Sequence, residues 1–245
     1  MRTAKAPKRD LAAARVHIGG AGRLGTAIAL TLHAAGIRHI SCNDPQTFEE
    51  EQFGCMVFSR RSDLGRPKVH VIDRFFDGRP GIIFEPLVAP NESPKARPLL
   101  EKADVIVSAA NKLSARLYLE RTAIALKKPV VQASVQDGRR ALGGSVSVWT
   151  PSAGCACFGC LFPRPKVRFS RGEVLPPSVT SAIAAIAAQR VLDLLGGPAS
   201  PAPNLTIIDL ANYAMEAISV KPRPSCKICA AAVTLNRARV IVAGK

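Results

Sequence analysis

The stretch RVHIGGAGRLGTAIALTLHAA, residues 15–35, passes from a short apolar segment through a cluster of glycines into a longer segment with helical periodicity. We predict a strand at 15–19 and a helix at 23–35, joined by the glycine turn GAGRLG at 20–25. Glycine lets a main chain approach a phosphate, and a helix N-terminus presents free N–H groups and partial positive charge to it. The stretch therefore predicts the first βα unit of a nucleotide-binding fold, although a tight turn without a ligand would give the same pattern.

An acidic residue follows the second predicted strand, which spans 38–42. Asp44 lies 19 residues after Gly25, at the end of this strand. A carboxylate in this position can accept hydrogen bonds from ribose hydroxyls. The turn and the acid together strengthen the prediction of a nucleotide site, but they do not separate ATP from NAD.

Strand-like apolar runs alternate with helical patterns through the first half of the chain. Beyond the opening unit, we predict helices at 67–76, 94–103 and 113–126, and strands at 38–42, 81–88, 104–108 and 129–133. Because the chain must return across a face of the sheet between such strands, they should pair in parallel with right-handed crossovers. We therefore predict a Rossmann-like, doubly wound, mostly parallel α/β sheet.

The pattern changes after residue 136. Strands predicted at 142–149, 205–210 and 216–220 are interrupted by one long helix at 178–195, so we expect a more antiparallel C-terminal half. Residues 163–177, rich in Pro and Arg, are the best candidate for a mobile loop.

Composition defines the broad class of protein. With 245 residues, 47% of them hydrophobic, the chain can bury a sizeable core. Its net charge of +16 attracts anions such as nucleotide phosphates, but the basic residues are not interleaved with aromatic ones, so a nucleic-acid function is not expected. The most apolar helical stretch is interrupted by Gln189, Arg190 and Asp193. We therefore expect a soluble, cytoplasmic protein without a membrane span.

Four of the seven cysteines form two Cys-x-x-Cys pairs. Cys157 and Cys160 make the first pair, and Cys226 and Cys229 make the second, which begins 66 residues after Cys160. Two such pairs can bring four thiolates to the corners of a tetrahedron that suits zinc, and a closed shell of this kind indicates a structural ion. Free buried thiols are the alternative. Cys155 lies beside the first pair, but Cys157 has the better spacing.

Several stretches together resemble the ThiF, MoeB and HesA proteins, a family related to ubiquitin-activating enzymes. The opening unit is similar to the family's strand, glycine turn and helix, and LGRPKV at 64–69 is similar to its IGxPKV signature. CFGCLFP at 157–163 and RPSCKIC at 223–229 resemble its two zinc pairs. The resemblance covers residues 15–229. It implies a nucleotide-binding domain with a structural zinc site that uses ATP and Mg to adenylate the C-terminal glycine of a ubiquitin-like or sulfur-carrier protein.

The resemblance also implies roles for single residues. Asp44 matches the family's ribose-binding aspartate, and Lys68 matches the lysine that contacts the phosphates, where a cation would stabilise developing charge. Lys68 is therefore the candidate catalytic residue. The residues implied to bind the nucleotide are Gly20, Gly22, Arg23, Gly25, Asp44, Lys68 and Asn111.

Two family positions hold different residues in this chain. Counting forward from Asp44 places Cys55 where the family has a catalytic arginine. The family's DCTDN stretch falls on 107–111, so Asn111 remains and Ala110 stands where an aspartate helps to hold magnesium. Removing a group that stabilises charge on the reacting centre typically costs about 10²- to 10³-fold in rate. Adenylation is therefore expected to be weak or lost unless other groups substitute.

Three functions stay open on the sequence. The first is a ThiF-type adenylyltransferase, the second is an inactive binding or scaffold subunit of the same fold, and the third is an NAD-dependent oxidoreductase, supported by the glycine turn and Asp44 alone. Residues 164–177 contain no cysteine where many family members form a thioester, so that step is not expected. Relatives in the family are commonly homodimers, and the apolar late helix fits either a dimer contact or a buried core helix.

We divide the chain into a basic tail and one domain of the ThiF type. The tail is 1–14 and the domain is 15–245. Within the domain we expect a nucleotide-binding half at 15–136, a zinc-containing half at 137–230 and a C-terminal tail at 231–245.

Overall fold

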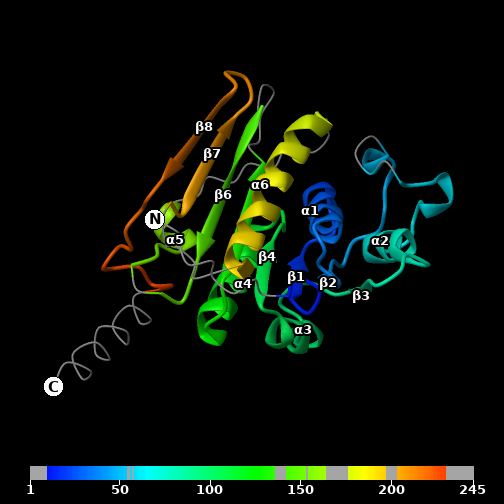
Figure 1. Cartoon of the computed structure of the whole chain (residues 1–245), viewed down its shortest axis with the longest axis horizontal. Helices are drawn as coiled ribbons and strands as arrows, with labels where there is room; N and C mark the ends of the chain where they lie inside the picture. Colours follow the sequence, from blue (N-terminus) through cyan, green and yellow to red (C-terminus); the bar gives the residue numbers. More distant parts are fainter. Residues whose placement is uncertain are drawn as a thin grey trace, which may run out of the picture.

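One sheet of eight strands runs through the protein, in the order β3-β2-β1-β4-β5-β6-β7-β8 (Figure 1). The computed structural model describes residues 10–53, 56, 58–135, 142–152, 154–163, 176–196 and 203–229. Its strands are β1 (Arg15–Gly19), β2 (His39–Asn43), β3 (Ile83–Leu87), β4 (Val105–Ser108), β5 (Val130–Val135), β6 (Gly143–Trp149), β7 (Leu205–Asp209) and β8 (Ala214–Ile218). Strands β1 to β5 pair in parallel, and β6, β7 and β8 join antiparallel. The predicted fold class is confirmed.

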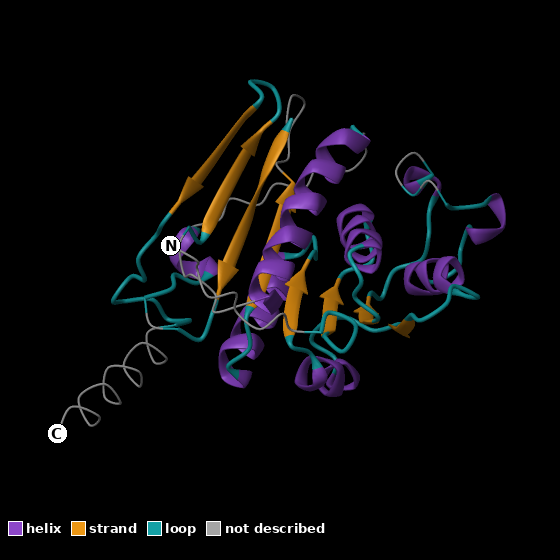
Figure 2. Ribbon diagram, in the orientation of Figure 1, coloured by secondary structure: helices purple, strands orange, loops and turns teal. Residues whose placement is uncertain are grey.

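Helices cover both faces of this sheet (Figure 2). The longer ones are α1 (Arg23–Ala34), α2 (Lys68–Phe76), α3 (Arg97–Lys102), α4 (Leu113–Leu126) and α6 (Pro177–Gly196). Val105 and Val107 of β4 belong to the core that includes residues of α1 and α6, whereas Ile106 packs with Leu100 of α3 and Leu119 of α4. Because successive side chains of a strand point to opposite faces, the two groups of helices lie on opposite sides of the sheet.

Helix α6 accounts for the long apolar stretch of sequence. By length and composition it could cross a membrane, with a mean hydropathy of 1.4. Its residues Ile183, Ala187 and Val191 are fully buried, and the helix packs against α1, β5 and β6. Because this face of α6 is buried within the fold, much of the apolar composition of the helix is explained by its packing.

The bounds of the elements differ from the predicted ones mainly at their ends. Helix α4 occupies the predicted residues, but the helix expected at 94–103 divides into a 3-10 turn, η3 (Pro94–Ala96), and α3. Prolines at the start of each piece have no N–H to donate, which disfavours one continuous helix. Three short helices were not predicted: η1 (Glu50–Gln52), η2 (Arg61–Asp63) and α5 (Phe158–Leu161). Cys55 and residues 164–175 of the expected mobile loop lie outside the described residues.

Candidate functional site

The glycine turn lies at the carboxyl end of β1. Gly20 has a φ of 112°, a backbone conformation that residues other than glycine rarely adopt. A Cβ atom on Gly25 would lie 1.8 Å from the carbonyl oxygen of Gly20, so glycine is needed there for the helix to lie this close to the turn. A Cβ atom on Gly22 would meet nothing within 4 Å, so this residue borders open space where α1 begins. The turn is thus tightly packed at two glycines and open at the third.

This open position coincides with the switch point of the sheet. β1 pairs with β2 on one side and with β4 on the other. In open α/β sheets, ligands bind outside the carboxyl ends of the strands at such a point. The N–H groups in the first turn of α1 have no acceptor within the helix, and they carry the positive end of the helix dipole. The turn can therefore bind a phosphate group.

Asp44 follows β2 and is hydrogen-bonded to the glycine turn. Its Oδ2 accepts the N–H of Ala21 at 2.8 Å, and its Oδ1 accepts the N–H of Gln46 at 2.8 Å. The residue is 7% exposed. Each carboxylate oxygen keeps a further lone pair, so the side chain can accept a ribose hydroxyl while it holds the turn.

Lys68 begins α2 beside the same edge of the sheet. Its N–H donates to the carbonyl oxygen of Gln46 at 3.0 Å, and a bridge joins Thr47 to Pro67. The side chain is buried, and Nζ donates to Oε1 of Gln46 at 3.0 Å. Among the described residues, Lys68 forms no ion pair, so its charge is available to a phosphate. Gln46 was not identified from the sequence, where nothing marks it except its place after Asp44.

The loop after β4 touches the glycine turn. A Cβ atom on Gly20 would come within 2.9 Å of the carbonyl oxygen of Ala109 and 3.0 Å of the nitrogen of Ala110. Asn111 is the next residue and is exposed. The fold therefore brings this loop to the same edge as the glycine turn, Asp44 and Lys68.

Arg23 connects α1 with the segment that follows Asp44. Its Nη2 donates to the carbonyl oxygen of Glu51 at 3.3 Å. A guanidinium has five N–H donors, so others remain for a phosphate. Cys55, which stands where the family has an arginine, is not among the described residues.

The four cysteines of the two pairs converge at one point. Their Sγ atoms lie within 4.8 Å of one another, and those of Cys157 and Cys226, and of Cys160 and Cys229, are 3.5 Å apart. A tetrahedral zinc with bonds of about 2.3 Å would place its sulfurs about 3.8 Å apart. The cluster could therefore hold one metal ion of this kind. Cys155 lies outside it, and its Sγ donates to the carbonyl oxygen of Val148 at 3.3 Å.

The thiols of this cluster are all buried. Burial raises the pKa of Cys157 above its ordinary value and that of Cys229 to about 12. Burial also acts to raise the pKa of Cys226, but the N–H groups of Cys229 and Ile228 outweigh it and lower this pKa to about 7. A metal must displace protons from such thiols, so its affinity should fall as the pH falls.

A buried carboxylate supports the first cysteine pair. Glu120 of α4 is fully buried, its Oε1 accepts the N–H of Phe158 at 3.1 Å, and its other oxygen accepts a hydrogen bond from the side chain of Gln132. Phe158 begins α5, which follows Cys157 and contains Cys160. Glu120 thus attaches the cysteine-bearing turn to α4 and β5. It was missed in the sequence, where a single acid in a helical pattern gives no distinct signal.

Comparison with known proteins agrees with this arrangement. The model of the ThiF family matches residues 2–228. The chain belongs to the ThiF family. The matched region contains the glycine turn, Asp44, Lys68 and three of the four clustered cysteines, ending one residue before Cys229.

The curated relatives of this ThiF-family chain are adenylyltransferases by name. It is 29% identical over 232 residues to the adenylyltransferase and sulfurtransferase MOCS3 of Anopheles gambiae, covering 91% of this chain and 51% of that protein. It is 24% identical over 226 residues to the sulfur carrier protein ThiS adenylyltransferase of Escherichia coli, covering 91% of this chain and 88% of that protein. The chain thus spans about half of MOCS3 and most of the ThiS adenylyltransferase.

Solved structures share the fold. Escherichia coli MccB with ATP has a TM-score of 0.73 to this chain at 18% identity, over 90% of this chain and 68% of that one. MccB with AMPCPP and MccA has a TM-score of 0.73 at 19% identity, over 90% of this chain and 67% of that one. Such identities establish the architecture, whereas roles for side chains have to come from the geometry of this chain.

Proposed function

We propose that this ThiF-family chain binds ATP with Mg at the carboxyl edge of its sheet and adenylates the C-terminal glycine of a small ubiquitin-like or sulfur-carrier protein. The observation that carries the proposal is the placement of the glycine turn, Asp44 and Lys68 at one edge. The names of the relatives support it, since one acts on the sulfur carrier ThiS. The cluster of four cysteines and the family signature disfavour the NAD-dependent oxidoreductase.

The reaction at this edge would be transfer of the adenylyl group of ATP to a carboxylate of the partner. A carboxylate oxygen of the partner attacks the α-phosphorus, the bond to the β-phosphate breaks, and pyrophosphate leaves. The helix N-terminus of α1 and the ammonium of Lys68 would stabilise the negative charge that develops on the phosphate oxygens. Asp44 would hold the ribose and so fix the position of the α-phosphate.

Magnesium would neutralise phosphate charge at the same edge. Asn111 can offer an amide oxygen, whereas Ala110 offers no side-chain ligand. Mg²⁺ often keeps several waters and is held through substrate phosphates with one or two protein ligands. The residues present therefore fit a metal held mainly by the nucleotide.

We propose zinc as the ion of the cysteine cluster, because four thiolates at this spacing suit its tetrahedral geometry. Four protein ligands leave no open position, so the ion would be structural. We also propose a cytoplasmic homodimer, on the family resemblance, and light scattering of the purified chain would test its oligomeric state.

A second candidate function is a scaffold subunit that binds the nucleotide without adenylating a partner. Ala110, 8% exposed beside the glycine turn, favours it, because no carboxylate is available there for magnesium. The missing carboxylate would lower the rate of adenylation even if ATP binds.

ATP–pyrophosphate exchange distinguishes the two functions. The purified chain is assayed with ubiquitin-like proteins encoded near its gene, alongside Lys68→Met and the control Lys95→Met, which changes an exposed lysine of η3. The enzyme is supported if exchange requires a partner and falls at least about 100-fold in Lys68→Met only. ATP binding without exchange for every partner would favour the scaffold.

A further inference from the structure

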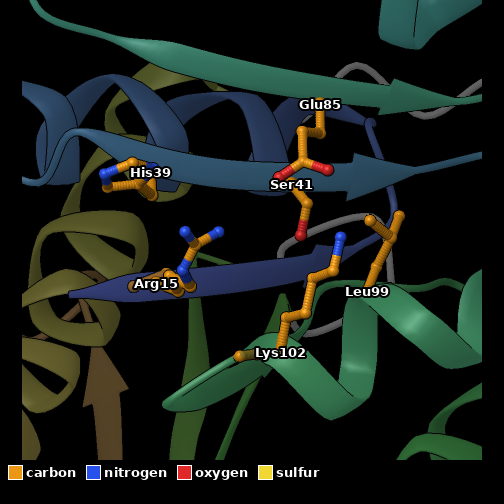
Figure 3. Close-up of a pocket in the computed structure, with 8 residues that line it drawn as sticks. Arg15, His39, Ser41, Glu85, Leu99 and Lys102 are labelled. Atoms are coloured by element: carbon orange, nitrogen blue, oxygen red, sulfur yellow. The ribbon is translucent and has the colours of Figure 1, made fainter. Parts of the chain in front are cut away.

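Arg116, near the start of α4, is a buried cation that the site described above does not use. The residue is 9% exposed. Two other cations on this face of the sheet, Arg15 and Lys102, are exposed and border a surface hollow near the start of β1 (Figure 3). Water and salt screen exposed charges of that kind, whereas a buried charge is screened much less. The charge of Arg116 therefore acts on its surroundings more strongly than theirs does.

The guanidinium of Arg116 continues the ladder between β4 and β5. The N–H of Ile106 donates to the carbonyl oxygen of Pro129 at 3.0 Å, so every second carbonyl from there on, including that of Ala133, faces β4. β4 ends at Ser108, whose partner is Gln132, so no residue of β4 reaches Ala133. The carbonyl oxygen of Ala133 accepts from Nη2 of Arg116 at 2.8 Å instead. The guanidinium thus lies where β4 ends, at the carboxyl edge of the sheet.

This position is close to the glycine turn. Ser108 pairs with Gly19, and the loop that follows Ser108 comes within 3.0 Å of a Cβ atom on Gly20. Neighbouring strands lie about 4.8 Å apart, so Ala133 on β5 is about 10 Å from the line of β1, and its carbonyl points towards β1. The guanidinium is therefore within about 10 Å of the turn that can bind a phosphate group.

No carboxylate among the described residues balances this charge. Arg116 takes part in none of their ion pairs, and its Nη1 is buried without a hydrogen-bond partner. Glu120, one turn further along α4, accepts from the N–H of Phe158 and from the side chain of Gln132. Burial lowers the pKa of Arg116 to about 10, so the guanidinium stays charged at pH 7. A water molecule could accept the free N–H, but only an anion would balance the charge.

We propose that the buried charge of Arg116 makes the nucleotide site selective for phosphorylated nucleotides over nucleosides. It attracts the phosphates of ATP through space, without contact, from below the loop after β4. This inference rests on the proposed function, because it requires ATP at the glycine turn. Over about 10 Å, at an effective dielectric constant of about 20, one unit charge changes the affinity for another about tenfold.

Calorimetric titration with MgATP and with adenosine tests this role. Arg116→Gln removes the charge, Arg116→Lys keeps it, and Arg121→Gln makes the same charge change on an exposed residue of α4. We expect Arg116→Gln to bind MgATP about tenfold more weakly and to bind adenosine within about twofold of the parent chain. Arg116→Lys and Arg121→Gln should bind both ligands nearly as the parent chain does.

The outcomes separate this inference from the proposed function. A parent chain that does not bind MgATP would refute both. A parent chain that binds MgATP, with unchanged affinity in Arg116→Gln, would refute the role of Arg116 alone. Equal losses for MgATP and adenosine, in the Lys variant as in the Gln variant, would show that the guanidinium acts only through its bond to Ala133.

A measurement on the parent chain covers the case in which Arg116→Gln does not fold. In ¹⁵N NMR, the Nε–H signal of Arg116 is assigned as the one missing from Arg116→Lys. MgATP should shift this signal, and adenosine should leave it in place, because only the phosphates carry charge. A signal that MgATP leaves in place would overturn the inference.

Discussion

The buried imidazole of His17 predicts how the stability of the fold depends on pH. The side chain is 0% exposed, and burial, opposed in part by the hydrogen bond to Asn43, lowers its pKa from 6.5 to about 4. Between these values the unfolded chain binds a proton that the folded chain excludes. The contribution of this group to stability is therefore complete above pH 6.5 and is lost as the pH falls towards 4. The full difference of about 2.5 pH units corresponds to about 3 kcal/mol.

Urea unfolding between pH 7 and pH 5 measures this effect. Over that range His17 alone should lower the free energy of unfolding by about 2 kcal/mol. His17→Gln has no titrating ring and should lose that part of the pH dependence, while His70→Gln, on the exposed surface of α2, should keep it. If zinc is bound, its release at low pH would affect all three proteins alike, so the difference between them isolates His17.

Equal pH dependence in the parent chain and in His17→Gln would refute this reasoning. If His17→Gln does not fold, the ring of the parent chain can be followed directly by NMR with ¹³C-labelled histidine. We expect the His17 signal to keep its neutral shift down to about pH 4. Titration near pH 6.5 would show that the ring is not held in the buried, neutral form.

The other predictions concern the glycine turn and the cysteine cluster. Gly25→Ala should destabilise the fold by roughly 1–3 kcal/mol or more in urea unfolding, because its Cβ would lie 1.8 Å from a carbonyl oxygen, whereas Gly22→Ala should change stability by about 1 kcal/mol at most. The reverse order would contradict the packing of the turn. Metal analysis should find about one equivalent of zinc, and less in Cys226→Ser; a metal-free parent chain that is stably folded would contradict the zinc site. In a chelator competition, Glu120→Ala should weaken zinc binding about 10- to 100-fold and Glu120→Gln less, because Gln can still accept the Phe158 N–H; an effect no larger than that of the exposed control Arg121→Ala would exclude the positioning role.

The sequence was informative where one local pattern has one physical cause. The glycines at 20–25 follow an apolar strand and open a helix, so the tight turn could be predicted from neighbouring residues alone. The cysteine pairs could be matched because zinc imposes a known spacing within each pair, and the clustering of Cys157 with Cys226 confirms that the two pairs meet. Periodicity predicted α4 to the residue.

Contacts between distant elements could not be predicted in this way. In the sequence, His17 is one residue of a strand pattern, and nothing marks it out. Its hydrogen bond with Ser41 depends on the register between β1 and β2, which no local pattern fixes. The support of Phe158 by Glu120 likewise depends on how α4 packs beneath α5. The acceptor of the Lys68 ammonium, Gln46, was missed because the bridge that brings α2 to the end of β2 is a tertiary contact.

The central claim is that the open side of the glycine turn is a binding site for ATP. Calorimetric titration of the purified chain with MgATP and with NAD, repeated on Gly22→Ala, measures it directly. Since a methyl group at Gly22 would stand in otherwise open space next to the helix N-terminus, we expect saturable ATP binding that weakens about tenfold or more in the variant, and no binding of NAD. No saturable ATP binding, ATP binding unchanged in Gly22→Ala, or a preference for NAD would contradict the account.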